Sequence, residues 1–156
     1  MSDTIGDNRP AESPGAADAA AAVLSLTVDA DNLYAMRAAV GAHGAQWGLT
    51  GPTLDRLLVV ASELASNSIR HAAGTGRLRL WSDGDAVWCE VSDDGPGIAD
   101  PDEVGTRPIP LTAEGGRGLW LCRQFCDGVT VVNRNPGCTV TVFLTIPATA
   151  PVSRDV

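Results

Sequence analysis

Apolar residues recur along the chain with two different spacings, and each spacing predicts one kind of secondary structure. A spacing near 3.6 residues marks residues 50–72 as a strongly amphipathic helix. Its expected core face consists of Leu54, Leu57, Leu58, Ala61, Leu64, Ala65 and Ala72. A helix with an Asp or Asn cap is expected before it, over residues 29–49. A third helix is expected to open at the glycine-rich residues 115–118.

Strict alternation of apolar and polar residues predicts the strands. The expected strands cover residues 22–28, 77–82, 86–93, 128–134 and 138–146. In the last of them every second residue from Cys138 to Ile146 is apolar, and the residues between are three threonines and one phenylalanine. Alternation this regular indicates an antiparallel sheet that helices cover on one face only. We therefore predict an α+β two-layer sandwich.

The segments outside the expected helices and strands mark the two ends of a single folded domain and a long loop within it. Residues 1–21 are acidic and rich in small residues, which predicts a disordered tail before a domain of residues 22–147, with residues 148–156 as a second tail. Residues 99–114 contain three prolines and no period, so we expect a long functional loop. No apolar run approaches the ~20 residues of a membrane span, and no signal peptide is visible. We expect a cytoplasmic protein without a membrane partner.

Charge and composition narrow the classes of function. The net charge of −8 argues against nucleic acid as a direct partner. All 11 basic residues are arginine, which excludes a P-loop and a eukaryotic-type protein kinase site, because each needs a lysine on the phosphates. The four cysteines lack the paired spacing of a zinc site, so we expect reduced thiols in the core.

A polar stripe interrupts the amphipathic pattern of the second helix. Glu63, Asn67 and His71 lie four residues apart, so their side chains follow one another along the same helix face. A stripe of this kind should face something polar. Taken alone, it is equally typical of a solvated helix surface.

Asp93 is the second anomaly, because it ends a strand on the parity of the core-facing residues. A carboxylate there is costly unless it has a dedicated partner. It opens the sequence "DDGPGI" (93–98), and "GGRGL" (115–119) follows later; either alone is also typical of a turn or a flexible loop. In this order and element context, the stripe and the two glycine motifs resemble those of the GHKL or Bergerat-fold ATPases over residues 22–147. That family includes histidine-kinase catalytic domains, gyrase, Hsp90 and anti-sigma serine kinases.

The resemblance implies a Bergerat fold with a mostly antiparallel mixed sheet, and ATP and Mg²⁺ as cofactors. Asn67 matches the family's metal-binding Asn, and an amide oxygen suits Mg²⁺. Glu63 would orient or deprotonate an attacking hydroxyl or water, unless it is a plain surface carboxylate. Asp93 matches the Asp that accepts a hydrogen bond from the amine of adenine, where guanine would present an oxygen. His71 is expected to close the helix structurally rather than to bind nucleotide.

The glycine motifs imply close approach of the backbone to a ligand. Gly95 and Gly97 would let the chain pass near the base and sugar, with Asp94 pointing to solvent. The residues expected at the phosphates open the third helix: Gly115, Gly116, Arg117, Gly118 and Leu119. Residues 99–114 would form the ATP lid. For Arg117 and for Arg107 in the lid, a phosphate contact and a solvated side chain both remain open.

Within the family, a free-standing domain with this element order is similar to the anti-sigma serine kinases. At 156 residues we expect no room for the dimerisation helices of a histidine kinase, and His43 lacks the neighbours of a phospho-accepting His. The similarity implies binding of a sigma factor, and transfer of phosphate from ATP to a Ser or Thr of a STAS-domain anti-anti-sigma partner. Arg37 on the first helix would touch a partner, although an ordinary exposed arginine is an equal alternative. Related proteins dimerise through the sheet side, so a homodimer is a further expectation.

The lid departs from the best-known pattern of this group. Glu114 stands where a basic residue is usual, and a Thr-Thr pair is replaced by the separated Thr106 and Thr112. This departure weakens the inference of phosphoryl transfer more than the inference of ATP binding. Two alternatives to a kinase therefore stay open: an ATP-responsive regulatory binding module without kinase activity, and slow ATP hydrolysis alone.

Overall fold

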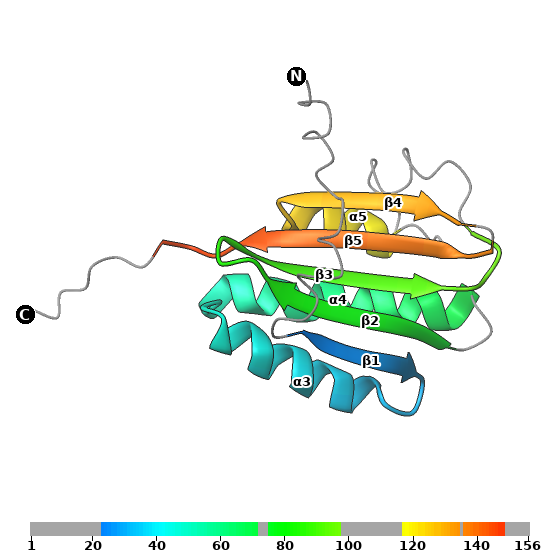
Figure 1. Ribbon diagram of the computed structural model, residues 1–156, viewed down its shortest axis with the longest axis horizontal. Coiled ribbons are helices and arrows are strands. Elements are labelled where there is room, and N and C mark those ends of the chain that lie inside the picture. The colour runs from blue at the N-terminus through cyan, green and yellow to red at the C-terminus, as the bar shows by residue number, and fades with distance from the viewer. Residues whose placement is uncertain (1–22, 72–74, 98–116, 135, 149–156) are drawn as a thin grey trace, which may run out of the picture.

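Five strands and three helices form two layers in the part of the chain that the structure describes (Figure 1). The structure, a computed structural model, describes residues 23–71, 75–97, 117–134 and 136–148, without the side chains of His71 and Arg117. The elements are β1 Leu24–Asp29, α3 Leu33–Gln46, α4 Gly51–His71, β2 Thr75–Ser82, β3 Ala86–Asp93, α5 Arg117–Phe125, β4 Gly128–Asn133 and β5 Cys138–Thr145. None of these helices has the length and apolar character that crossing a lipid bilayer requires.

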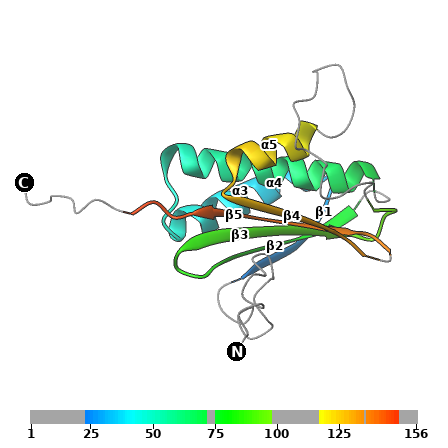
Figure 2. The ribbon, with the colours of Figure 1, turned by 90° about the horizontal axis from the view of Figure 1, so that it is seen from above.

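The strands form one sheet in the order β1-β2-β3-β5-β4, and all four pairings are antiparallel. Figure 2 shows that the three helices lie on the same side of this sheet, with the strands as the second layer. The predicted α+β two-layer sandwich is confirmed, but the sheet is antiparallel throughout the described strands rather than mixed. The alternation along β5 has the expected consequence, because Val140, Val142 and Leu144 are buried beneath the helices.

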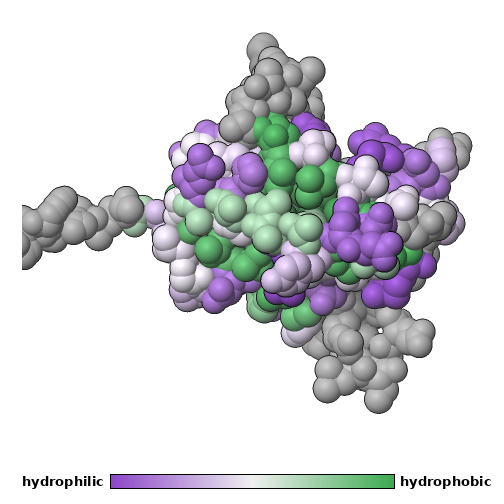
Figure 3. All heavy atoms as spheres, turned by 90° about the horizontal axis from the view of Figure 1, so that it is seen from below, coloured by the Kyte–Doolittle hydropathy of each residue, from purple (hydrophilic) through white to green (hydrophobic). Residues whose placement is uncertain are grey.

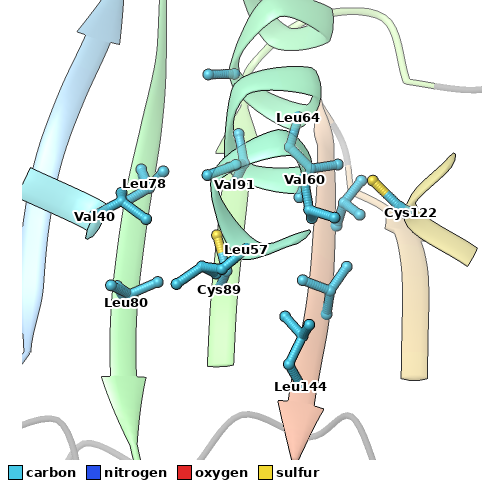
Figure 4. Close-up of a cluster of buried hydrophobic side chains, with 14 of the residues drawn as sticks. Val40, Leu57, Val60, Leu64, Leu78, Leu80, Cys89, Val91, Cys122 and Leu144 are labelled. Atoms are coloured by element: carbon cyan, nitrogen blue, oxygen red, sulfur yellow. The ribbon is translucent and has the colours of Figure 1, made fainter. Parts of the chain in front are cut away.

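The core lies between the sheet and the helices, and cross-strand rows of apolar residues build it. Leu80 pairs with Cys89, which pairs with Val142, and all three side chains are fully buried. Figure 4 shows how these strand residues meet side chains from α3, α4 and α5, among them Val40, Leu57, Val60, Leu64 and Cys122. Burying one large apolar side chain contributes about 1.5–3 kcal/mol, so this layer holds the helices in place over the sheet.

The buried face of α4 differs in part from the predicted one. Val60 and Ser68, which the prediction left out, are buried, whereas Leu54 and Leu58 are only partly buried and Ala72 lies outside the described residues. The reason is the neighbouring helix α3, against which the two leucines pack.

Two glycines of α3 allow this close packing. A Cβ on Gly44 would lie 2.8 Å from Leu57 and 3.0 Å from Leu54, and one on Gly41 would lie 3.4 Å from Leu58. The glycines inside this helix therefore leave space where the α4 leucines approach. Glycine lowers the helix propensity of α3, and the close packing against α4 offsets that cost.

The outer face of α3 consists largely of small residues. In Figure 3 the α3 edge of the molecule faces the viewer and shows a pale green band between purple areas. The exposed residues of this helix include Ala35, Ala38, Ala42 and Ala45. The expected cap residue, Asn32, does precede the helix, but its side chain does not bond to it; its Oδ1 instead accepts a hydrogen bond from the N–H of Asp29 at 2.8 Å.

Candidate functional site

The polar stripe of α4 lies directly against the first turn of α5. A Cβ on Gly118 would lie 2.8 Å from Oε1 of Glu63 and 3.4 Å from Nδ2 of Asn67. Glycine at position 118 permits this approach without a shift of the Glu63 side chain. The first N–H groups of a helix have no partner inside it, so the start of α5 brings free donors and the positive end of a helix dipole beside a carboxylate and an amide.

Asp93 is held at the end of β3 by two donors. Its Oδ1 accepts a hydrogen bond from the N–H of Gly95 at 2.9 Å, and its Oδ2 accepts one from the hydroxyl of Ser68 at 3.4 Å. Asp93 faces Cys138 across the β3–β5 pairing. Burial raises the pKa of the Cys138 thiol to about 11, and the nearby Asp93 carboxylate adds to the rise. The Asp93 carboxylate is partly exposed and can accept further hydrogen bonds from a ligand.

Ser68 is a site residue that the sequence analysis missed. It is only 3% exposed, and its hydroxyl lies 3.4 Å from both Oδ2 of Asp93 and the carbonyl oxygen of Thr75. A Cβ on Gly76 would lie 2.2 Å from Oγ of Ser68, so β2 leaves space for this hydroxyl. The signal in the sequence was Ser68 itself, four residues after Leu64 on the core face, because a buried hydroxyl requires a partner.

Two glycines with positive φ shape the strand ends beside Asp93. Gly137 has a φ of +105°, and a Cβ there would lie 1.9 Å from the carbonyl oxygen of Asp93. Gly97 has a φ of +89°, and its Cβ would lie 2.9 Å from Oδ1 of Asn133. The predicted need for glycine at position 97 therefore has a cause within the protein, namely the approach of β4, whatever ligand passes near it.

The structure brings most of the described candidate residues into one site. Gly118 links Glu63 and Asn67, and Ser68, the next residue on α4, links this cluster to Asp93. The site thus runs along the second half of α4, from the start of α5 to the end of β3.

Three other candidate residues have different surroundings. Arg37 is exposed on α3, which lies toward the β1 edge of the sheet, whereas α5 lies toward the β4–β5 edge (Figure 1). Leu119 is 2% exposed and packs in the core, so only its backbone is free to meet a ligand. Asp94 is exposed, as expected, and forms a loose ion pair with Arg77 at 3.5 Å.

The remaining candidates lie outside the described residues. These are Gly115, Gly116, the expected lid of residues 99–114 with Arg107, and the side chains of His71 and Arg117. The backbone of Arg117 is the first residue of α5, so the glycine motif does open a helix.

The donor set fits a metal-bound nucleotide. In the described part of the chain no group of three or more His, Cys, Asp or Glu side chains is placed to hold a metal ion. A hard cation held by the amide oxygen of Asn67 would take further ligands from oxygens of a bound nucleotide, which is how Mg²⁺ commonly binds with phosphates. The start of α5 suits phosphate oxygens, and the strand-end carboxylate of Asp93 suits an amine.

An antiparallel sheet under three helices, with an amide-bearing helix and a strand-end acid around one site, defines an ATP-binding domain of the GHKL type. The chain belongs to the histidine kinase-like ATPase domain family, whose model matches residues 26–144. No curated protein matches the chain in sequence.

Solved structures show the same fold. The catalytic domain of the histidine kinase ThkA, in a nucleotide-free form, matches with a TM-score of 0.51 at 14% identity, over 79% of this chain and 98% of that one. The histidine kinase AdeS of Acinetobacter baumannii matches with a TM-score of 0.51 at 18% identity, over 80% of this chain and 68% of that one. At these identities the likeness supports the fold.

Proposed function

We propose that the chain binds ATP with Mg²⁺ and transfers the γ-phosphate to a Ser or Thr of a STAS-domain anti-anti-sigma protein, and that it also binds a sigma factor. The observation that carries the proposal is the close approach of Gly118 to Glu63 and Asn67. It supports a site in which a carboxylate, an amide and a helix N-terminus act together on a phosphate group.

Each described group has a distinct part in this proposal. Asp93 accepts a hydrogen bond from the amine of adenine, and Ser68 and Gly95 hold its carboxylate in place. Asn67 supplies an oxygen to Mg²⁺, and the start of α5 supplies N–H donors to the phosphates. The metal would neutralise phosphate charge, which a protein with a net charge of −8 must balance locally.

Glu63 is the proposed general base. Its carboxylate would take the proton of the acceptor hydroxyl while the new O–P bond forms and the bond to the leaving ADP oxygen breaks. The partly exposed position of Glu63 beside α5 leaves an acceptor hydroxyl room to approach.

The proposed partner surface is the outer face of α3. Arg37 is exposed there among small residues, and Tyr34 is 86% exposed. An exposed surface of alanines with one arginine and one tyrosine suits contact with another protein, since Arg and Tyr are enriched at energetically important interface positions.

A regulatory module that binds ATP without transferring phosphate is the second candidate. The lid sequence favours it, because Glu114 places a negative charge just before the glycines that would approach the phosphates. The two candidates share the ATP site and differ only in transfer.

The nucleotide site is tested by selectivity. We expect ATP to bind more tightly than GTP in the presence of Mg²⁺, and we expect Asp93→Asn to weaken ATP about 10- to 100-fold, the cost of losing a hydrogen bond to a charged group. Isothermal titration calorimetry measures both. Asp94→Asn is the matched control, because it removes the adjacent, exposed carboxylate. Equal ATP affinities for Asp93→Asn and the wild type would remove Asp93 from the adenine site.

Phosphoryl transfer is tested with a STAS-domain acceptor and radiolabelled ATP. We expect Glu63→Gln to lower the transfer rate at least about 100-fold while ATP affinity changes little, since general-base catalysis typically contributes 10²–10⁴-fold. Asp55→Asn, on an exposed position of the same helix, is the control. Transfer at the normal rate by Glu63→Gln would exclude Glu63 as the base. Nucleotide-dependent capture of the partner with no labelled acceptor, even with wild-type protein, would favour the binding module.

A further inference from the structure

Arg70 forms a contact that the proposed function does not use. Its Nη2 donates a hydrogen bond to Oδ1 of Asn67 at 2.5 Å, one turn back along α4. An arginine side chain has only donors, so it can bind only the oxygen of the amide. That oxygen is the same atom that a Mg²⁺ ion would need.

The two polar atoms of the Asn67 amide, Nδ2 and Oδ1, have different neighbours. Nδ2 lies toward the start of α5, 3.4 Å from the position of a Cβ on Gly118. Oδ1 accepts a hydrogen bond from the guanidinium of Arg70, a side chain that is otherwise exposed to solvent. A metal ion that approaches this oxygen therefore meets the positive charge of Arg70.

A metal ion and a guanidinium cannot readily share one carbonyl oxygen, because both are cations and repel each other at contact distance. We propose that Arg70 is an internal competitor of the metal: its guanidinium occupies the Asn67 oxygen in the metal-free site, and Mg²⁺ must displace it for the metal–nucleotide complex to form. This inference rests on the proposed ATP site. It makes Arg70 a positioning residue that sets how much Mg²⁺ the site requires.

The proposed competition predicts the direction in which loss of Arg70 changes the affinities for Mg²⁺ and for ATP. Without the guanidinium the Asn67 oxygen is free, so the metal needs a lower concentration to bind. In the absence of metal, Arg70 adds a positive charge beside Asn67, so we expect its loss to weaken metal-free binding of the anionic ATP. Both effects raise the ratio of ATP affinity with Mg²⁺ to ATP affinity without it. A purely structural role of Arg70 would change both affinities together and leave the ratio unchanged.

The test is a calorimetric titration of the full chain with ATP, in EDTA and at a series of free Mg²⁺ concentrations. We expect Arg70→Ala to lower the Mg²⁺ concentration at half-maximal affinity by about three- to fivefold, the size expected for one exposed charged contact. Arg70→Lys, which keeps the charge but lacks the planar fork, should lie between Arg70→Ala and the wild type. Arg56→Ala is the matched control, because Arg56 is exposed on the same helix, far from Asn67 in sequence. Thermal melts check that each variant folds.

The outcomes separate the inference from the function on which it rests. A lower Mg²⁺ requirement for Arg70→Ala and not for Arg56→Ala supports the competition. An unchanged or higher requirement for Arg70→Ala, with ATP still bound, overturns the competition and leaves the ATP site standing. Absence of any ATP binding by the wild type at saturating Mg²⁺ overturns the proposed function, and the inference with it.

Discussion

Asp93 shows at the scale of a single residue how the fold accommodates a carboxylate at the end of a core strand. Its strand parity turns it toward the helices, where an unpartnered charge would be costly. The N–H of Gly95 and the hydroxyl of Ser68 each meet one of its oxygens, and part of the carboxylate stays exposed. The acid is thus oriented by the protein while it keeps capacity for a ligand.

Ser68 should therefore matter for nucleotide binding more than for folding. We expect Ser68→Ala to weaken ATP about three- to tenfold, because Asp93 loses one donor worth about 1 kcal/mol and with it part of its fixed orientation. Calorimetric titration measures the change. Ser62→Ala is the matched control, since its hydroxyl is buried on the same helix and has no hydrogen-bond partner in the described part of the chain. A Ser62→Ala variant with the same loss of ATP affinity would show that the effect is not specific to Asp93.

A candidate site residue could be predicted from the sequence only where it interrupted the apolar pattern of its helix or strand. The strand parity of Asp93 and the spacing of Glu63 and Asn67 were violations of an apolar pattern, so they could be predicted. Ser68 is small enough to pass for a core residue, and its space is provided by Gly76 on a different strand. Arg70 is an ordinary helix-surface residue in sequence, and only the direction of the Asn67 amide gives it a role.

At the scale of the elements, the periods predicted which segments are helices and strands, and contacts between elements decided the details. The prediction for α4 missed the buried Val60 and placed Leu58 on the core face, whereas Leu58 is partly buried and lies near Gly41 of α3. Thr75 and Gly76 extend β2 by two residues before the predicted start. Gly76 lies within the strand and leaves space for Ser68 of α4.

The start of α5 is an element-scale feature that completes the candidate site beside Glu63 and Asn67. The sequence predicted a helix opening at the glycine motif, and α5 does begin at Arg117. What the sequence could not predict is the partner of Gly118, because Glu63 and Asn67 lie more than 50 residues earlier in the chain. Packing of α5 beside α4 creates the site.

At the scale of the whole molecule, the helices leave the opposite face of the sheet uncovered in the described structure (Figure 2). Trp81 and Trp88 stack there with ring centroids 6.0 Å apart, and Phe143 lies 4.7 Å from Trp88. Arg79 lies over Trp81 and pairs with Glu90 at 3.1 Å. An aromatic row of this kind is compatible with the expected homodimer, which stays a prediction.

The proposed nucleotide site includes α4 and α5 from the helical layer and the end of β3 from the sheet, so ligand binding and global stability should be coupled. Cys89 reports on this coupling, because it is fully buried on β3, and burial raises the pKa of its thiol well above the ordinary value. Alkylation requires a thiolate, so Cys89 should react only when the domain opens. A ligand that binds only the folded state at about 100 times its Kd stabilises that state by about 2.7 kcal/mol. We therefore expect ATP with Mg²⁺ to slow labelling of Cys89 about 100-fold, measured by mass spectrometry of labelled peptides.

Two comparisons, one with GTP and one with Cys126, show whether slower labelling of Cys89 reflects specific binding of ATP. GTP at the same concentration should protect Cys89 far less, because in the proposed site the Asp93 carboxylate would face an oxygen of guanine. Cys126 is only partly buried, so its labelling should depend less on global opening and respond less to ATP. If ATP binds but Cys89 labels at an unchanged rate, the sheet must open around β3 without releasing the nucleotide. A ligand held by α4, β3 and α5 together must leave when those elements separate. An unchanged labelling rate would therefore show that the site does not depend on the packing of the two layers.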